Sequence, residues 1–483
     1  MFLSLFAVFL SVLIFFKFIS PCTYWKEKGI KHVPAWPLVG SMGRVFFKKQ
    51  PYVEFVIDLY NKFSNERYVG FMKFTQNCVL IRDIELIRNI TGKEFNYFTD
   101  RTVLSQLKND PILSKSLISL SGDNWRDMRA TLSPVFSSNK IRNMYTFIEK
   151  CAQNFISHYK AEVEVEVKEI FSKYANDVIA SVAFGVEIDS LKEPNNEFYA
   201  NTSPLSPNFF KKLLIGKEKN DRQDLVNLLM EARNGALKFE TYKRAKGEGF
   251  AIEGEPEIDP LANQVELSDD QILAQALLFF FTAFDTISTS SSFLAYELAV
   301  NLDVQKKLQR EIDRVMQITG DKIPYDALLS MKYLDQVISE SLRKWPPKFE
   351  TDRLCTRDYH LKPQKSETRS LLIKKGMPVV LPIIAIHRDP LYYPNPNRFD
   401  PDRFNDENRS KVIPGTYLPF GSGPRNCLGV RLALLEIKTL FCYLLSKFDI
   451  VQVKKTQMPI KLSPKCLDMQ PEDGFWLGFR PRN

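Results

Sequence analysis

Apolar residues recur every three or four positions along most of the chain beyond about residue 100, which is the spacing of helices that bury one face. One earlier segment, residues 52–61, shows the same spacing. Ser268 precedes two acidic residues and offers an N-cap for the longest of these segments, and Pro346 and Pro347 stop another. The predicted helices cover residues 52–61, 141–161, 168–186, 223–237, 269–316, 323–346 and 429–448.

Strand-like patterns are short and few. RYVGFMKF (67–74) alternates apolar and polar positions, and CVLIRD (78–83) is a brief apolar run, so the two predict a small sheet. Short strands and Pro-rich coil fill residues 348–426. No repeat and no long Gly/Ser linker divides the sequence. We therefore expect a protein that is mainly α with a minor β part.

The first twenty residues, MFLSLFAVFLSVLIFFKFIS, have a pattern of their own. They lack the basic start and small-residue cleavage site of a removable signal, and their apolar run is near the ~17-residue lower limit for a membrane-spanning helix. An aromatic pair and three lysines follow at positions 24–31, which places the bulk of the chain on the cytosolic side. We predict a signal anchor at residues 1–20, a Pro-rich hinge at 21–45 and one large body at 46–483.

Composition narrows the possible chemistry. The chain is 44% hydrophobic and 25% charged, an ordinary globular balance, and its net charge of +9 is spread along the sequence. This distribution favours a solvated surface over a basic strip that docks an acidic partner or anionic lipid, and no nucleic-acid partner is expected. Seven irregularly spaced cysteines and four histidines suggest neither a disulfide framework nor a zinc site. Cysteine chemistry must therefore come from a single residue in a reducing compartment.

The stretch LLFFFTAFDTISTSS, residues 277–291, combines strong apolarity with the polar pair Asp285 and Thr286. An ionised carboxylate in an apolar setting costs several kcal/mol unless it is partnered. On these residues alone, the simpler interpretation is an Asp285 paired with a lysine on the far side and a Thr286 bonded to its own helix.

The segment PFGSGPRNCLGVRLALLEIK, residues 419–438, carries Cys427 in a Gly-rich loop that leads into a helix. Gly421, Gly423 and Gly429 allow the backbone to approach a flat object closely. The helix N-terminus beyond the sulfur favours thiolate over thiol. An incidental cysteine in a helix lead-in is an equally good interpretation of these residues alone.

FGSGPRNCLG, residues 420–429, matches the haem-binding signature of the cytochrome P-450 family, Phe-x-x-Gly-x-Arg-x-Cys-x-Gly, at every fixed position. Four further segments resemble family motifs in the family's order: WRDMR (125–129), TAFDT (282–286), ESLR (340–343) and FDPDRF (399–404), the last with Asp402 where the family has Glu. The likeness covers essentially the whole chain and is greatest to the microsomal, arthropod-type detoxification branch.

The resemblance implies the cytochrome P-450 fold, a long helix bundle around haem b with small β-sheets and an N-terminal membrane anchor. It makes 46–483 the haem-thiolate catalytic domain and Cys427 the axial ligand and metal-binding residue, whose thiolate favours O–O cleavage. It assigns the remaining cofactor contacts to Trp125, Arg129, Ala283, Arg353, Phe420, Gly421, Arg425 and Gly429, with Arg101 as a further candidate for the propionates.

Two pairs take on roles through the same resemblance. Asp285 and Thr286 become catalytic residues that bracket a local widening of the helix and deliver protons through ordered water. Glu340 and Arg343, at i and i+3 on one helix, become a structural pair that Arg403 completes. Gly is usual where Ala283 stands, so the oxygen groove is expected to be narrower than in most members.

A second departure concerns the substrate. Residues 199–222 occupy an interval where the microsomal family has two further helices, so the roof of the substrate cavity is expected to be truncated. The predicted function is an endoplasmic-reticulum-anchored monooxygenase for a small apolar substrate such as a xenobiotic, lipid or hormone-like molecule. The alternatives are a weakly active or non-catalytic haem- or ligand-binding paralogue and a thiolate isomerase acting on peroxides.

The predicted partners are membrane lipid and an NADPH–cytochrome reductase, because no nucleotide-binding Gly-rich turn is visible in this chain. We expect the reductase to dock on the face around Cys427, with Lys140, Arg142, Arg431 and Lys438 as candidate contacts.

Overall fold

The computed structural model describes residues 6, 20–102, 105–200, 224–233, 250, 263, 265–363 and 370–482. The predicted anchor, residues 1–20, lies outside this set except for Phe6 and Ser20. The short interval 199–222 lies outside it except for Tyr199 and Ala200.

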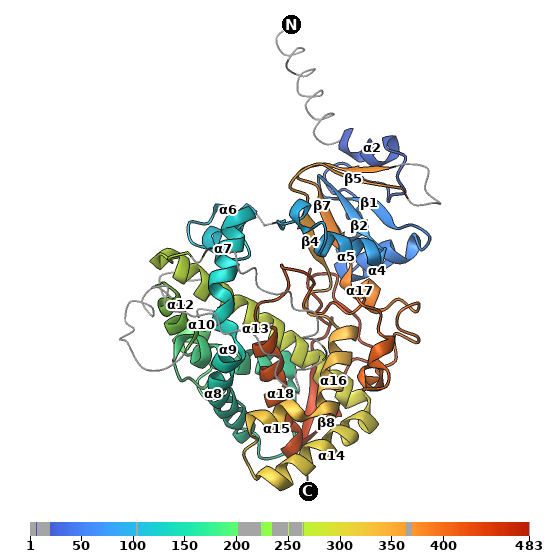
Figure 1. The fold of residues 1–483 in the computed structure, drawn as a ribbon. Helices are drawn as coiled ribbons and strands as arrows, with labels where there is room; N and C mark the ends of the chain where they lie inside the picture. Colours follow the sequence, from blue (N-terminus) through green and yellow to red (C-terminus); the bar gives the residue numbers. More distant parts are fainter. Residues whose placement is uncertain are drawn as a thin grey trace.

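A small β-rich part forms one end of the molecule, at the top of Figure 1. Its main sheet has the strand order β1-β2-β7-β4, in which β2 and β7 run parallel and the other pairs run antiparallel. The elements of this part are α2 (Ser20–Glu27), α3 (Gly43–Phe46), α4 (Tyr52–Lys62), β1 (Tyr68–Lys73), β2 (Gln76–Ile81), α5 (Ile84–Thr91), η2 (Phe95–Tyr97), β4 (Thr351–Leu354), β5 (Tyr359–Leu361), β6 (Leu371–Ile373), β7 (Pro378–Leu381) and α17 (Ile383–His387). The two strands predicted near residue 70 are confirmed as β1 and β2.

The segment predicted as a Pro-rich hinge is partly packed. Helix α2 within it buries Trp25, whose indole N–H donates to the carbonyl of Phe71 at 3.1 Å. Gly70 faces that indole so closely that a side chain there would lie 2.3 Å from the ring. Residues 20–27 are therefore fixed to the sheet.

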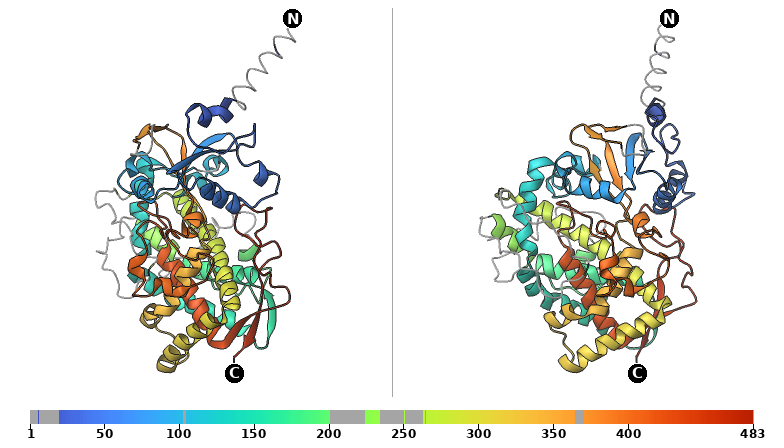
Figure 2. Two further views of the ribbon diagram at one scale, coloured as in Figure 1. Left: turned by 90° about the vertical axis from the view of Figure 1, so that its right-hand side faces the viewer. Right: turned by 45° about the vertical axis from the view of Figure 1, so that its right-hand side comes forward.

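The larger part is helical, as the sequence predicts, and lies below the β-rich part in Figures 1 and 2. Its helices are α6 (Ser105–Asn109), η3 (Leu113–Lys115), α7 (Gly122–Leu132), η4 (Ser133–Phe136), α8 (Ser138–Ser157), α9 (Val167–Phe184), α10 (Glu197–Ala200), α12 (Leu225–Arg233), α13 (Asp269–Val300), α14 (Leu302–Thr319), α15 (Tyr325–Ser330), α16 (Lys332–Lys344), η6 (Pro401–Phe404), η7 (Arg409–Lys411) and α18 (Val430–Lys447). Two more small sheets complete the fold: β3 (Val163–Glu166), β9 (Trp476–Pro481) and β8 (Phe448–Gln452) in that order, and the β5–β6 pair.

Helix α13 is the central element of the helical part. Ser268 caps it through a capping box, as predicted, accepting from the N–H of Gln271 while the Gln271 side chain accepts from the N–H of Ser268. Helix α13 contacts α9, α16 and α18 and buries most of its length. Among the described residues it is the one helix long and apolar enough to cross a membrane, and most of its apolar stretch is buried within the protein.

Two predicted helices are each divided in two. The segment 269–316 breaks at Asn301, whose side chain donates to the carbonyl of Glu297 and ends α13. The segment 323–346 breaks at Met331, whose backbone is extended. Neither break follows from apolar spacing, because that spacing continues across both positions.

Candidate haem-thiolate site

The cysteine loop, residues 420–429, is folded back on itself just before α18. The N–H of Cys427 donates to the carbonyl of Phe420 at 2.9 Å, and the N–H of Asn426 donates to the carbonyl of Gly423 at 3.0 Å. Cys427 is exposed and lies three residues before Val430, the first residue of α18. The sulfur therefore projects from a tight turn close to a helix N-terminus, where a thiolate is favoured.

Two of the three glycines have a backbone reason that the structure makes visible. Gly421 and Gly423 have φ of +78° and +72°, values that side-chain-bearing residues rarely adopt. A Cβ on Gly423 would also lie 1.8 Å from the carbonyl oxygen of Thr91, the last residue of α5. Gly429 has neither constraint, since its φ is −94° and a Cβ there would meet Phe136 at an ordinary 3.7 Å.

Three arginines from three distant segments surround this loop, and a fourth, Arg425, belongs to the loop itself. Arg353 on β4 donates to the carbonyl of Ser422 at 2.9 Å, and Arg101 donates to that of Arg425 at 2.8 Å. Arg129 on α7 donates to the carbonyl of Asn426 at 2.9 Å. The guanidinium of Arg425 stacks on the Trp125 ring at 4.0 Å and donates to the carbonyl of Thr99. The structure therefore brings the predicted Trp125, Arg129, Arg353 and Arg425 together at the cysteine loop, with Arg101 among them.

Positive charge is in excess in this arginine cluster. The pKa of Arg425 is lowered to about 8, first by burial and then by the charge of Arg101, and that of Arg353 is lowered to about 9 for the same two reasons. Asp100, 3.9 Å from Arg425, and Asp352 oppose these effects. Within the described chain, the buried Nε atoms of Arg101 and Arg353 have no hydrogen-bond partner.

The donor set therefore fits a dianionic group. Buried N–H donors without partners and uncompensated guanidinium charge would both be relieved by two carboxylates. The charge of Cys427 also acts favourably on Arg101. Haem has two propionates and an iron that takes a thiolate, so the residues present fit haem b.

Asp285 is not buried, although the sequence predicts an apolar environment for its carboxylate. Its side chain is 46% exposed and pairs with Lys168 on α9 at 3.1 Å. Lys168 also donates to the hydroxyls of Ser288 and Thr289, at 2.7 and 2.6 Å. Burial lowers the pKa of Lys168, and the Asp285 charge counteracts that effect. The apolar residues around Asp285 in sequence lie on other faces of α13, which explains the difference.

Thr286 is bonded to its own helix. Its hydroxyl donates to the carbonyl of Thr282, one turn earlier, and Thr282 does the same to Leu278. Helix α13 is an unbroken α-helix from Asp269 to Val300, so the predicted local widening is not present. Ala283 is partly buried on the same turn. Thr286 bonded to its own helix and Asp285 paired with a lysine match the simpler interpretation of these residues given above.

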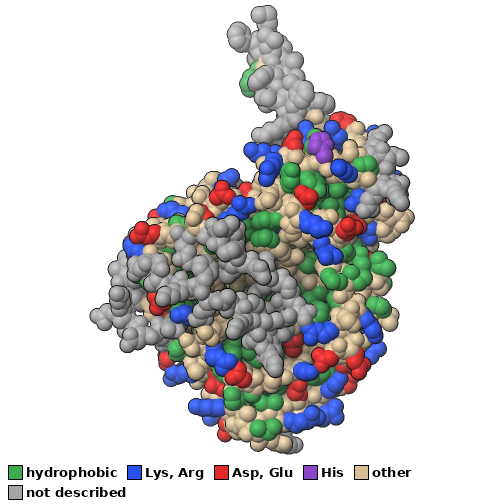
Figure 3. Space-filling view, viewed as in Figure 1, with side chains coloured by type: hydrophobic (Ala, Val, Ile, Leu, Met, Phe, Trp, Pro, Cys, Tyr) green, Lys and Arg blue, Asp and Glu red, His purple; other side chains and the backbone are tan. Residues whose placement is uncertain are grey.

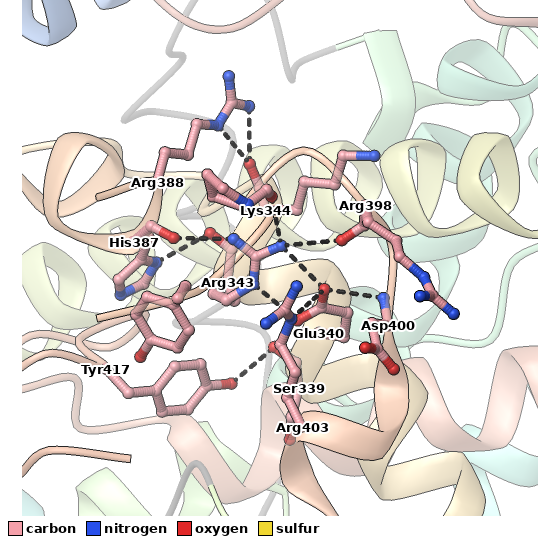
Figure 4. Close-up of polar contacts among 12 residues, drawn as sticks. Ser339, Glu340, Arg343, Lys344, His387, Arg388, Arg398, Asp400, Arg403 and Tyr417 are labelled. Atoms are coloured by element: carbon pink, nitrogen blue, oxygen red, sulfur yellow. Dashed lines mark hydrogen bonds and ion pairs between the residues drawn. The ribbon is translucent and has the colours of Figure 1, made fainter. Parts of the chain in front are cut away.

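Glu340, Arg343 and Arg403 meet as the resemblance implies (Figure 4). Arg343 donates to both oxygens of Glu340, at 2.7 and 2.8 Å, and both side chains are fully buried on α16. Arg403 approaches the Oε1 atom of Glu340 at 3.4 Å, and the N–H of Asp400 donates to the same atom at 2.9 Å. Burial raises the pKa of Glu340, whereas Arg343 acts in the opposite direction.

His387 was not singled out from the sequence and links this pair to the cysteine loop. Its Nε2 accepts from the N–H of Leu418 at 2.8 Å, and its Nδ1 lies 3.0 Å from the carbonyl of Arg343. An accepting Nε2 requires a proton on Nδ1, so the ring is neutral. Burial and the charge of Arg343 lower its pKa to about 3. A buried histidine that lacks a sequence motif gives no signal of such a role.

The candidate residues for reductase docking differ in their exposure and in their ion pairs. Lys438 is buried and pairs with Asp335 at 3.1 Å, so it cannot contact a partner and that assignment is wrong. Arg142 is half-exposed and makes a bidentate contact with Asp326. Lys140 lies 3.9 Å from Glu231. Positive and negative side chains are interspersed over the face shown in Figure 3.

A family model described as "Cytochrome P450" matches residues 31–477. The chain is 37% identical to "Cytochrome P450 9e2" of Blattella germanica, over 95% of this chain and 94% of that protein. It is 34% identical to "Cytochrome P450 9c1" of Drosophila melanogaster, over 99% and 98%.

A third relative, "Probable cytochrome P450 9f2" of Drosophila melanogaster, is 33% identical over all of this chain and 99% of that protein. The alignment spans 537 positions against the 483 residues of this chain, so at least 537 − 483 = 54 positions have no residue here. This chain therefore lacks at least 54 residues that the relative has, at positions inside the aligned region.

Proposed function

Because the chain belongs to the cytochrome P450 family, we propose that the Cys427 thiolate would bind the iron of haem b and that the surrounding arginine cluster would bind the propionates. Family members bind haem b through a cysteine thiolate, and the chain is a haem-thiolate monooxygenase that uses a redox-partner reductase and apolar substrates. When bound, haem supplies the chemistry by which one atom of dioxygen enters the substrate and the other becomes water.

The residues in and around the cysteine loop would contribute to haem binding in different ways. The N-terminus of α18, which begins three residues beyond Cys427, would stabilise negative charge on its sulfur. Arg101 and Arg353 hold the loop by donating to its carbonyls, which leaves their Nε–H groups available for carboxylates. The ring face of Trp125 stabilises the Arg425 guanidinium through a cation–π contact.

We propose that Asp285 and Thr286 pass protons from solvent through ordered water, Asp285 by taking up and releasing a proton and Thr286 by holding the water. The Thr286 hydroxyl donates its hydrogen to the carbonyl of Thr282, so the oxygen keeps lone pairs that can accept a hydrogen bond from bound water. Asp285 is held by Lys168 on the α9 side. The Ser288 and Thr289 hydroxyls would keep Lys168 satisfied if Asp285 turned away, so that movement leaves no bare buried charge.

We also propose that the positions missing relative to the Drosophila relative fall mainly in the interval 199–222, so that the substrate cavity has a short roof. Support comes from the at least 54 aligned positions, 537 − 483, at which the relative has a residue and this chain has none, and from the two prolines that interrupt this interval. A short roof makes the cavity more accessible to water. The comparisons support a monooxygenase rather than a non-catalytic paralogue.

Finally, we propose that NADPH–cytochrome reductase supplies the electrons and that the protein is anchored to the endoplasmic reticulum by residues 1–20. Close to the anchor in sequence lies a set of exposed apolar side chains suited to a lipid surface. The set comprises Trp36, Leu38, Phe46, Phe47 and Phe74. Two of these, Leu38 and Phe74, have φ of +70° and +54°, values that bulky residues rarely adopt.

The observation that carries the proposal is the convergence of Cys427 with buried, partly unpartnered arginines. The reduced carbon-monoxide difference spectrum of the full-length protein tests it. We expect a thiolate-type band in the wild type and in Cys466→Ser, a control at a partly buried cysteine remote in sequence, and none in Cys427→Ser. A band that persists in Cys427→Ser would contradict the assignment. Substrate-dependent NADPH consumption with added reductase then separates an enzyme from a haem-binding paralogue.

A further inference from the structure

Phe250 lies in an aromatic socket that no motif predicts. It falls between residues 234–249 and 251–262, which are outside the described chain, yet its own contacts are well defined. Its ring centroid is 5.1 Å from that of Phe404 and 5.2 Å from that of Tyr417, and those two rings are 4.9 Å apart. The Arg409 guanidinium lies 5.6 Å from the Phe250 ring. Three rings in mutual contact form a closed apolar cluster.

The socket is built from residues next to the buried Glu340 site. Phe404 is 5% exposed and directly follows Arg403, the second cation at Glu340. Tyr417 donates its hydroxyl to the carbonyl of Ser339 at 3.0 Å and stacks on His387 with ring centroids 5.6 Å apart. The two walls of the socket therefore belong to the segments that deliver Arg403 to α16 and lead into the cysteine loop.

The backbone of Phe250 is fixed as well. Its N–H donates to Oδ2 of Asp335 on α16 at 3.0 Å. The other oxygen of Asp335 pairs with Lys438 on α18, the helix that follows Cys427. Phe250 thus contacts the supports of the cysteine loop through its ring and through its N–H group.

We propose that Phe250 is a positioning residue for haem retention: its ring closes the socket and limits the movement of Arg403 and of the segment that runs from Tyr417 into the cysteine loop. The proposal rests on the haem site proposed above. Removing the ring leaves the Phe404 and Tyr417 faces without a packing partner, and a loss of that size allows side chains and backbone to shift. Each aromatic contact of this kind changes an equilibrium roughly two- to tenfold.

The alternative is that Phe250 adds only to overall stability. Tyr159 supplies a matched control, because it is also partly buried and contacts three aromatic rings, Phe155, Phe448 and Phe479. It packs against β8 and β9 and is involved in none of the socket contacts. Loss of its ring tests global stability without touching the loop supports.

The experiment measures haem transfer from the full-length holoprotein to excess apomyoglobin, together with the free energy of unfolding in urea. We expect Phe250→Ala to release haem about tenfold faster than the wild type. Its reduced carbon-monoxide spectrum should show a larger fraction of the non-thiolate band. Tyr159→Ala should unfold at lower urea and release haem at nearly the wild-type rate.

Equal release rates in Phe250→Ala and Tyr159→Ala, or a wild-type rate in Phe250→Ala, would overturn the proposal. If Phe250→Ala yields no holoprotein, Phe250→Leu replaces it, because it keeps apolar volume and loses the ring. Its expected release is about twofold faster than the wild type, and a wild-type rate again rejects the idea. Wild-type protein without thiolate-bound haem would reject the proposed haem site instead, before any variant is compared.

Discussion

Lys168 holds four acceptors at once: the carboxylate and carbonyl of Asp285 and the hydroxyls of Ser288 and Thr289. Such a lysine fixes the rotamer of Asp285 and ties α9 to the part of α13 that carries Thr286. Because its pKa is lowered by burial, its charge depends on these contacts. The proposed proton path begins at the half-exposed Lys168–Asp285 ion pair. It ends at the Thr286 hydroxyl, which donates its hydrogen to the carbonyl of Thr282.

Thr286→Ala removes that hydroxyl while leaving the haem contacts in place. We expect normal haem content and substrate oxidation reduced about tenfold or more relative to NADPH consumption, with the difference appearing as hydrogen peroxide. Thr282→Ala, which removes a similar helix-bonded hydroxyl one turn earlier, should keep normal coupling. Unchanged coupling in Thr286→Ala would exclude a proton-delivery role.

Helix α16 is the element on which the supports of the cysteine loop converge. It carries the buried Glu340–Arg343 pair, the Ser339 carbonyl that accepts from Tyr417, and Asp335, which pairs with Lys438 of α18. Arg343 also donates to the carbonyls of His387 and Pro396, so one guanidinium joins the helix to two later segments. A change in α16 is therefore transmitted to the loop by several separate contacts.

Arg343→Lys replaces a planar fork by a point charge and cannot satisfy these acceptors. Stranding the buried Glu340 carboxylate should cost about 3–5 kcal/mol of unfolding free energy and give protein without haem. Haem per polypeptide, measured on purified protein, is the readout. Arg314→Lys, at an exposed position of α14, is the control and should retain haem. Normal haem in Arg343→Lys would reject a structural role for the pair.

Most helices could be predicted from apolar periodicity, because it acts over a few residues, whereas the roles of the cysteine loop and of the α16 pair were predicted from the resemblance of their motifs to the family. The partners of these groups could not be predicted. Lys168 lies 117 residues from Asp285, and a lysine in the first turn of a helix has no local mark of its target. The parallel pairing of β2 with β7 likewise joins segments some 300 residues apart through tertiary packing alone. Burial of Asp285 was wrongly inferred because apolar neighbours in sequence need not share its face.

On the scale of the whole molecule, the proposed short roof contrasts with the supports of the cysteine loop, which connect β4 to α18. At least 537 − 483 = 54 aligned positions of the Drosophila relative have no residue in this chain. A short roof would admit water to the cavity, so a larger share of the reducing equivalents would be lost as hydrogen peroxide. Turnover is therefore expected to be less well coupled than in a longer relative.

A chimera tests this expectation. Replacing residues 199–222 by the corresponding longer segment of the Drosophila relative should lower peroxide release per NADPH severalfold and leave the carbon-monoxide spectrum unchanged. A replacement of the same interval by a Gly/Ser segment of equal length serves as the control for length alone. Coupling that stays the same in the chimera would show that the interval does not govern water access.

The neutral, buried His387 has a consequence for the protein under acidification. An unfolded histidine binds a proton near pH 6.5, whereas the folded pKa is lowered to about 3. Below about pH 6.5 the unfolded chain therefore takes up a proton that the folded chain excludes, and stability falls by up to about 1.4 kcal/mol per pH unit from this group. A proton on Nε2 would break its hydrogen bond with the N–H of Leu418, which lies just before the cysteine loop. Protonation of His387 would therefore destabilise the fold and loosen the segment that leads into the loop.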